Sequence, residues 1–161
     1  MGAYSHLPYR PGVGIMLLNR DGLVFVAQRI DKTSEAWQMP QGGMDAGESP
    51  LVTAYRELEE ETGVPESAVE LLVQTEADAP LCYDLPDDLV PKLWKGKFRG
   101  QEQHWFAMRL LEDDSVINIE TEHPEFNEWK WVEMGALPDI IVPFKREMYA
   151  DIVAFFKPRL A

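Results

Sequence analysis

Carboxylate side chains gather in one short stretch of the sequence, RELEEETG, at residues 56–63. Within it, one arginine stands beside Glu57, Glu59, Glu60 and Glu61. If the stretch is helical, like charges three and four positions apart repel each other by roughly 0.2–0.5 kcal/mol per pair. Either it is a solvated acidic face that tolerates this repulsion, or a positive species binds there.

Three of these carboxylates would share one side of a helix. At about 100° per residue, Glu57, Glu60 and Glu61 span an arc of roughly 100°, whereas Glu59 points elsewhere. Three hard oxygen ligands on one rigid element suit Mg²⁺ or Mn²⁺, whose remaining positions are filled by water and substrate phosphate. The helix alone favours the solvated face, because acidic runs are common on exposed helices, so the surrounding sequence has to decide.

The flanking residues predict where this helix begins and ends. Ser49 is a suitable N-cap, Pro50 suits the first helical position and Gly63 is a natural stop, which predicts a helix over 50–62. Before it, apolar runs on both sides of Asp21-Gly22 predict a β-hairpin.

Further elements follow the acidic helix. The segments AVELLVQTEA, HWFAMRLL and EWKWVEM are typical of strands, and the C-terminal FKREMYADIVAFFKPRL predicts an amphipathic helix. Residues 81–103 read as a long irregular connection, and such connections are often functional. Strands around one central and one terminal helix predict a mixed α+β fold in a single domain.

The composition bounds the function. The 161 residues, 45% of them hydrophobic and 27% charged, fit one ordinary globular domain. A net charge of −13 argues against a generic nucleic-acid binder and against DNA as a partner, so a polyanionic substrate needs a local basic site or bridging cations. The single cysteine, Cys82, and the lack of a signal-like or membrane-spanning apolar run predict a cytoplasmic protein without membrane contact.

The stretch from Gly42 to Val64 fits the pattern G-x5-E-x7-R-E-U-x-E-E-x-G-U, where U is a bulky aliphatic residue. The fixed positions are Gly42, Glu48, Arg56, Glu57, Leu58, Glu60, Glu61, Gly63 and Val64. Every fixed position of the Nudix box is present, so the chain resembles the Nudix hydrolases. This match reverses the preference for a solvated face.

The resemblance implies a Nudix fold, a mixed sheet packed between helices, over residues 9–157, with tails at 1–8 and 158–161. It also implies metal ligation by Glu57, Glu60, Glu61 and the Gly42 carbonyl, with two to three Mg²⁺ or Mn²⁺ ions, and an orienting role for Arg56. Water would attack phosphorus in a polyphosphate chain. The general base is left open between Glu57, Glu61 and no dedicated base.

Segments outside the box resemble one branch of the family: the bacterial RNA pyrophosphohydrolases and the dinucleoside polyphosphate hydrolases similar to them. These segments include YRPGVG, WQMPQGG, YDLP, GQEQHWF, HPEF and VPFKREMY. By this resemblance Glu125 is a further metal ligand, Arg10 and Lys145 contact phosphates, Arg29 and Phe144 sandwich a nucleobase, and Gln41 and Tyr83 belong to the substrate site. A surface acid at Glu125, an exposed strand end at Arg29 and structural roles for Phe144 and Tyr83 are the alternatives.

One basic segment stands out in this acidic chain. KLWKGKFRG places Lys92, Lys95, Lys97 and Arg99 around Trp94 and Phe98. It is either a flap that steers phosphates over the substrate site or an edge that lysines keep in solution.

The resemblance favours removal of pyrophosphate from 5′-triphosphate RNA. The alternative is hydrolysis of dinucleoside polyphosphates such as diadenosine tetraphosphate, and a non-catalytic nucleotide-binding module ranks third because the box is intact. Pro80 and His104 depart from the branch and bear on fine substrate preference. The state of assembly, monomer or dimer, any activating partner and the 5′ base preference are left open.

Overall fold

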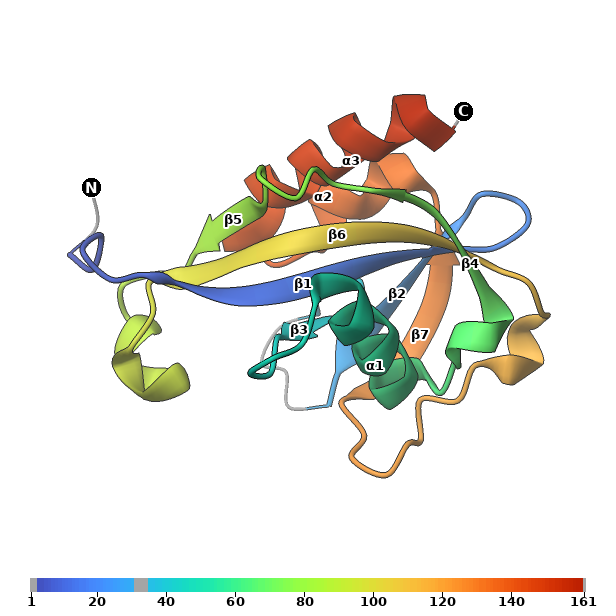
Figure 1. Cartoon of the computed structure of the whole chain (residues 1–161), viewed down its shortest axis with the longest axis horizontal. Helices are drawn as coiled ribbons and strands as arrows, with labels where there is room; N and C mark the ends of the chain where they lie inside the picture. Colours follow the sequence, from blue (N-terminus) through green and yellow to red (C-terminus); the bar gives the residue numbers. More distant parts are fainter. Residues whose placement is uncertain (1–2, 31–34, 161) are drawn as a thin grey trace.

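A mixed β-sheet lies between helices in the computed structural model of the chain, which describes residues 3–30 and 35–160 (Figure 1). The strands are β1 (Tyr9–Leu18), β2 (Val24–Arg29), β3 (Gln41–Gly43), β4 (Val69–Gln74), β5 (Leu81–Asp84), β6 (Gly100–Leu110) and β7 (Phe126–Val132). The helices are α1 (Pro50–Thr62), α2 (Leu137–Ile140) and α3 (Arg146–Leu160). Short 3₁₀ turns lie at Glu66–Ala68, Val90–Lys92, Trp94–Gly96, Asp114–Val116, Met134–Ala136 and Pro143–Lys145.

The sheet is built on two long parallel strands at its centre. Its order is β4-β6-β1-β2-β7, with β3 added to β1 and β5 added to β6. β1 and β6 run parallel in continuous register from Tyr9 opposite Gly100 to Leu18 opposite Arg109, whereas the other strand pairs are antiparallel. Both faces of the central pair are covered, as is usual for parallel strands. The mixed α+β class expected from the sequence is therefore confirmed.

Two hydrophobic clusters fill the two sides of the sheet. Successive side chains of β1 alternate between them, so Ile15 packs on the α1 side with Leu58 and Met16 packs on the other side with Ile152 of α3. Figure 1 shows α2 and α3 on one side of the sheet and α1 on the other. The acidic helix and the C-terminal helix are thus held on opposite faces of one sheet.

Helix α1 has the ends that its sequence predicts. The Ser49 side chain accepts a hydrogen bond from the Val52 amide. At the other end, Gly63 adopts the left-handed region, with φ of 74°, and donates its N–H to the Glu59 carbonyl. The predicted hairpin is also confirmed, because β1 and β2 pair across a turn in which the Gly22 amide bonds the Asn19 carbonyl.

The stretch 81–103 is less irregular than its sequence indicates. Its first four residues form β5, which pairs antiparallel with β6 from Leu81 opposite Gln103 to Asp84 opposite Gly100. A second difference is β3, three residues of the turn-rich segment that pair with β1. Both strands are short and depend on pairing with a distant partner, so no local periodicity announces them.

The C-terminal helix begins later than expected. The prediction started it at Phe144, but Pro143–Lys145 form a separate 3₁₀ turn and α3 starts at Arg146. Met148, Ile152 and Phe156 are buried along one face of α3, which fits the predicted amphipathic helix, whereas Phe155 is only partly buried. Phe144 and Lys145 therefore belong to the turn before α3 and not to the helix itself.

The proposed tails 1–8 and 158–161 continue into ordered structure where the structure describes them. Tyr4 and Leu7 pack against the core on the α3 side, and α3 runs through Leu160. Residues 1, 2 and 161 lie outside the described residues, and the domain boundaries stay a prediction. Within the described ranges, none of the helices is long and apolar enough to cross a membrane.

Gly14 gives a test of the central strand pair. A Cβ at Gly14 would lie 2.3 Å from the indole ring of Trp105, a fully buried side chain of β6. We expect Gly14→Ala to lower the free energy of unfolding by about 1–3 kcal/mol through overpacking, measured by urea denaturation.

Gly135→Ala is the matched control, because a Cβ at Gly135 meets no atom within 4 Å. Its effect should stay within about 0.5 kcal/mol. Equal losses in the two variants would contradict the close packing of Gly14 against Trp105.

Candidate active site

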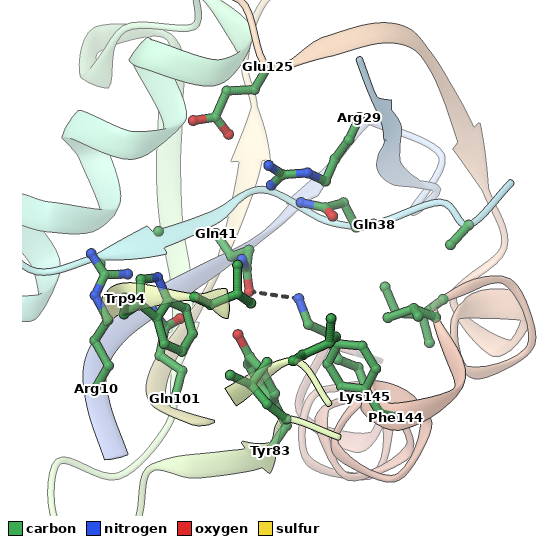
Figure 2. A pocket seen from close by; sticks show the side chains of 18 of the residues that line it. Arg10, Arg29, Gln38, Gln41, Tyr83, Trp94, Gln101, Glu125, Phe144 and Lys145 are labelled. Atoms are coloured by element: carbon green, nitrogen blue, oxygen red, sulfur yellow. Dashed lines mark hydrogen bonds between the residues drawn. The ribbon is translucent and has the colours of Figure 1, made fainter. Parts of the chain in front are cut away.

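A cavity of about 630 Å³ opens where β1, β3 and β5 meet the turn before α3. Of the residues proposed from the sequence, the cavity is lined by Arg10, Arg29, Gln41, Gly42, Glu57, Tyr83, Glu125, Phe144 and Lys145. Figure 2 shows Glu125 and Arg29 on one side of it and Tyr83, Phe144 and Lys145 on the other. The fold therefore brings together residues that lie more than one hundred positions apart in the chain.

Two carboxylates of α1 point inward beside β3. Glu57 is 9% exposed and Glu61 is 1% exposed, because one turn separates them on the helix face that packs towards the sheet. A Cβ at Gly42 would lie 2.1 Å from the Glu57 carboxyl carbon, so only glycine fits where β3 passes this side chain. Neither Glu61 oxygen has a hydrogen-bond partner of normal geometry in the described residues. Buried acceptors without partners fit a site that binds a cation or holds a proton.

Burial also changes how these two groups bind protons. Loss of hydration raises the pKa of Glu57 to about 7, against the opposing effect of Arg56 and with smaller contributions from Glu60 and Glu125. Burial likewise raises the pKa of Glu61 well above its ordinary value, and the neighbouring Glu57 and Glu125 carboxylates raise it further. Ionising both carboxyls in this place therefore has an electrostatic cost, which a bound proton or cation would offset.

Arg56 holds the loop before α1 against the helix. Its guanidinium donates two hydrogen bonds to Glu48, at 2.6 and 2.8 Å, and a third to the Gly43 carbonyl at 3.2 Å. Arg56 lowers the pKa of Glu48 to about 2, helped by the bond from the Asp45 amide. Arg56 also pairs with Glu57, at 3.1 Å, so it fixes one buried carboxylate from behind.

Glu60 does not share the inward orientation. Its side chain is 57% exposed and pairs with Arg56 at 3.2 Å, and it does not line the cavity. The three carboxylates predicted to form one stripe are thus two buried groups and one surface group. Packing of α1 against the sheet buries Glu57 and Glu61 and leaves Glu60 at the surface, although all three fall within an arc of roughly 100°.

The residues present fit a divalent cation. Glu57, Glu61 and Glu125 supply hard oxygen atoms, and the backbone of Gly42 lies close to the Glu57 carboxylate. In the described ranges, no three carboxylate, imidazole or thiol side chains already converge on one point closely enough to hold an ion. Binding would therefore bring these carboxylates together from their present positions.

Cationic groups line the other parts of the cavity. Lys145 is 8% exposed, and burial lowers its pKa to about 8, with Arg29 acting in the same direction and Glu61 opposing it. Its amine lies 4.7 Å from the centre of the Tyr83 ring. Arg10 stacks on Trp94 at 5.1 Å. The cationic side chains would attract an anion bound in the cavity. The carboxylates at the other end would repel it unless cations were bound between them.

Phe144 and Arg29 lie on opposite sides of the cavity in Figure 2. Phe144 packs on Tyr83 with ring centres 5.9 Å apart, and Tyr83 itself is 6% exposed. Tyr83 is thus both a core residue and part of the wall, so the two alternatives for it are not exclusive. Arg29 and Phe144 each bring to the cavity wall a flat group on which a ring can stack.

The basic segment KLWKGKFRG lines the cavity with apolar and aromatic side chains, whereas its sequence predicted basic ones. Arg99 is held by Asp84 at 2.9 Å and lies over the Tyr9 ring, and no lysine of the segment lines the cavity. The lining residues from this region are Leu89, Leu93 and Trp94. Its wall at the cavity is therefore apolar and aromatic, because the turns at residues 90–96 direct the lysines outward.

Two residues expected to affect substrate preference lie away from the cavity, and two residues that line the cavity were not predicted. Pro80 and His104 do not line it, whereas Gln38 and Gln101 do. Gln101 belongs to a strand whose other inward side chains include Gln103. Two glutamines at alternate positions of a buried strand are a signal that sequence reasoning could have used, because buried amides must be hydrogen-bonded.

Sequence comparison identifies relatives of the whole chain. A family model described as "NUDIX domain" matches residues 8–152. An RNA pyrophosphohydrolase of Roseobacter denitrificans is 55% identical over 156 residues, covering 97% of this chain and 96% of the relative. One of Sphingopyxis alaskensis is 52% identical over 155 residues, covering 96% and 97%.

Structural comparison gives the same fold at much lower sequence identity. A dihydroneopterin triphosphate pyrophosphohydrolase of E. coli superposes with a TM-score of 0.68 at 19% identity, covering 91% of this chain and 98% of the other. An Ap4A hydrolase of C. elegans superposes with a TM-score of 0.64 at 19% identity, covering 92% and 98%. At this identity the likeness concerns the fold alone.

The raised pKa values predict how stability depends on pH without divalent ions. Between about pH 5 and about pH 7, Glu57 and Glu61 hold more protons in the folded chain than in the unfolded chain, so stability falls as pH rises. We expect Glu61→Gln to flatten this fall and to be more stable than the parent chain at neutral pH. Urea denaturation in the presence of a chelator measures both effects.

Glu59→Gln is the control, because Glu59 is exposed on the same helix. Its stability should follow the parent chain across the same pH range. A slope that is the same in Glu61→Gln and in the parent would show that the buried pair does not govern the pH dependence.

Proposed function

The chain belongs to the Nudix family, and we propose that it removes pyrophosphate from the 5′ end of triphosphorylated RNA. The observation that carries this proposal is a cavity lined by the carboxylates of Glu57 and Glu125 at one end and by the cationic side chains of Arg10, Arg29 and Lys145 elsewhere, with Glu61 buried beside Glu57. The relatives with 52% and 55% identity over nearly the whole chain are RNA pyrophosphohydrolases, which supports RNA as the substrate.

Nudix hydrolases depend on divalent metal ions, and here Mg²⁺ or Mn²⁺, in two to three ions, is the proposed cofactor. Glu57, Glu60, Glu61, Glu125 and the Gly42 carbonyl are the proposed ligands. Bound there, the ions would polarise the phosphate, lower the pKa of water and offset the charge of the substrate. Glu60 would join them by rotating from its surface pairing with Arg56, whereas Glu57, Gly42 and Glu125 already line the cavity.

The side chains of this chain have separable tasks in the reaction. Arg56 is a positioning residue, because it holds the loop and the Glu57 carboxylate through charge-assisted hydrogen bonds. Glu57 and Glu61 are the candidates for accepting the proton of the attacking water. The raised pKa of Glu57, about 7, suits a group that must accept a proton near neutral pH.

The cationic residues bind the substrate in this proposal. Arg10 and Lys145 contact phosphate oxygens, Arg29 and Phe144 hold a nucleobase between them, and Gln41 and Tyr83 complete the wall. A 5′-triphosphate RNA would extend past the base site to the protein surface. A dinucleoside polyphosphate such as diadenosine tetraphosphate is the second candidate substrate, because the apolar wall with Trp94 offers a place for a second base.

The setting of the enzyme is part of the proposal. The single cysteine suits the reducing bacterial cytoplasm, with no membrane or DNA partner. The chain acts as a monomer or a dimer.

A direct assay tests the reaction. With Mg²⁺, the protein should convert a short 5′-triphosphate RNA to the 5′-monophosphate faster than it splits diadenosine tetraphosphate, judged by kcat/KM and products. Glu57→Gln should lose roughly 100-fold or more of kcat, because it removes charge where the cations bind. Glu59→Gln, which changes an exposed acid of the same helix, should keep the parent activity. Faster release of ATP and AMP from the dinucleotide would assign the second candidate substrate instead.

The base site has its own test. Removing the ring in Phe144→Ala should raise KM for the RNA roughly ten-fold, since stacking of one base contributes about 1–3 kcal/mol. Phe155→Ala removes a partly buried ring on α3 that does not line the cavity, and KM should stay near the parent value. An unchanged KM in Phe144→Ala would remove Phe144 from the substrate site.

A further inference from the structure

A chain of buried amides runs from the core to the floor of the cavity. It starts at Trp105 of β6, whose indole N–H donates to the Gln103 side-chain oxygen at 2.9 Å. Trp105 and Gln103 are both fully buried, and Gln103 does not line the cavity. The Gln103 amide nitrogen donates in turn to the side-chain oxygens of Gln41, at 2.7 Å, and Gln101, at 2.6 Å.

The Trp105 indole N–H sets the donor and the acceptor of every hydrogen bond in this series. An indole N–H is a donor only, so the Gln103 atom facing Trp105 must be its oxygen. The Gln103 amide group must then donate its two hydrogens, and the atoms that receive them must be oxygens. Turning Gln103 over would place its amide against the indole N–H of Trp105, donor against donor, at a buried position. The amide orientations are therefore coupled across two strands, β6 and β3.

Lys145 confirms the same direction at the far end. Its amine, which is also a donor only, approaches the Gln41 side-chain oxygen at 3.3 Å. Gln41 thus receives hydrogens from both Gln103 and Lys145 on one oxygen. The amide nitrogens of Gln41 and Gln101 are the atoms left for the cavity, which both residues line.

The neighbouring strand β1 leaves room for this chain. Gly12 lies opposite Gln103 and Gly14 opposite Trp105 in the parallel register. A Cβ at Gly12 would lie 2.6 Å from the Gln101 side-chain oxygen and 2.8 Å from the Gly42 carbonyl, while Gly14 accommodates the Trp105 ring. A larger residue at Gly12 would displace the Gln101 amide, and one at Gly14 would displace the Trp105 indole, so the two glycines and the hydrogen bonds between these side chains belong together.

We propose that Gln103 is a positioning residue that turns the amide groups of Gln41 and Gln101 towards the cavity, so that the substrate's phosphate chain meets a row of donors between Arg10 and Lys145. Figure 2 shows Gln101 and Gln41 lying between those two cations. The row offers N–H groups and no acceptor, which suits phosphate oxygens and disfavours groups that present hydrogens. The two neutral amides add donors without adding charge that would repel Arg10 or Lys145.

This inference rests on the proposed function for its substrate, but it can be tested separately. The full-length protein is labelled with ¹⁵N, and its glutamine side-chain amide signals are followed during titration with inorganic tripolyphosphate in metal-free buffer. The Gln41 and Gln101 signals should shift more than that of the exposed Gln74. No shift at Gln41 and Gln101 with a shift at other cavity residues would overturn the proposal.

Variants test the role of Gln103. Gln103→Met keeps the length of the side chain but breaks the chain of bonds, and it should raise KM for 5′-triphosphate RNA roughly ten-fold with kcat within about two-fold. Tripolyphosphate affinity should fall by a similar factor. Gln74→Met, at the exposed end of β4, is the matched control and should change neither value.

A triple variant separates a positioning role of Gln103 from a purely structural role. If Gln103 acts through Gln41 and Gln101, adding Gln103→Met to the Gln41→Met/Gln101→Met double variant should leave KM unchanged within about two-fold. An additive rise in KM, or a parent-like KM in Gln103→Met alone, overturns the proposal. If the parent protein does not hydrolyse the RNA at all, the proposed function fails, and the tripolyphosphate titration still decides the role of the amides.

Discussion

The burial of two carboxylates beside each other is the constraint on which the site depends. Glu57 and Glu61 lie on the inward face of α1, where loss of hydration raises the pKa of both and neighbouring carboxylates raise them further. Charged groups are costly in such a place unless they are paired or coordinate a metal. The Glu61 oxygens, which lack partners of normal geometry in the described part of the chain, show that the folded protein alone does not satisfy them.

Other features of the fold follow from keeping this pair in place. Gly42 lets β3 pass close to Glu57, and Arg56 ties the loop of residues 43–48 to the helix through Glu48. The Ser49 cap and the left-handed Gly63 fix where α1 begins and ends, and both acids lie between these two ends. The hydrophobic side of α1, with Ala54 and Leu58, presses this arrangement against the sheet.

The opposite side of the cavity carries positive charge, which an acidic protein needs where it binds a polyanion. The net charge of −13 is spread over the surface, whereas Arg10, Arg29 and Lys145 converge on the cavity. The carboxylates at the other end recruit cations in the proposed mechanism, so both ends meet the substrate with positive charge. The buried glutamines add hydrogen-bond donors between them without further charge.

Local signals in the sequence determined the parts that depend on near neighbours. Helix 50–62 follows from its caps, the hairpin from Asp21-Gly22, and the Nudix box from residues within one loop and one helix. Strands β3 and β5 were missed, since each is short and forms only by pairing with β1 or β6. The equal treatment of Glu57, Glu60 and Glu61 was also a local inference, and packing against the sheet divided them into buried and exposed groups. The meeting of Arg10, Glu125 and Lys145 at one cavity, and the amide directions set by Trp105, depend on contacts between distant strands, which only the tertiary structure decides.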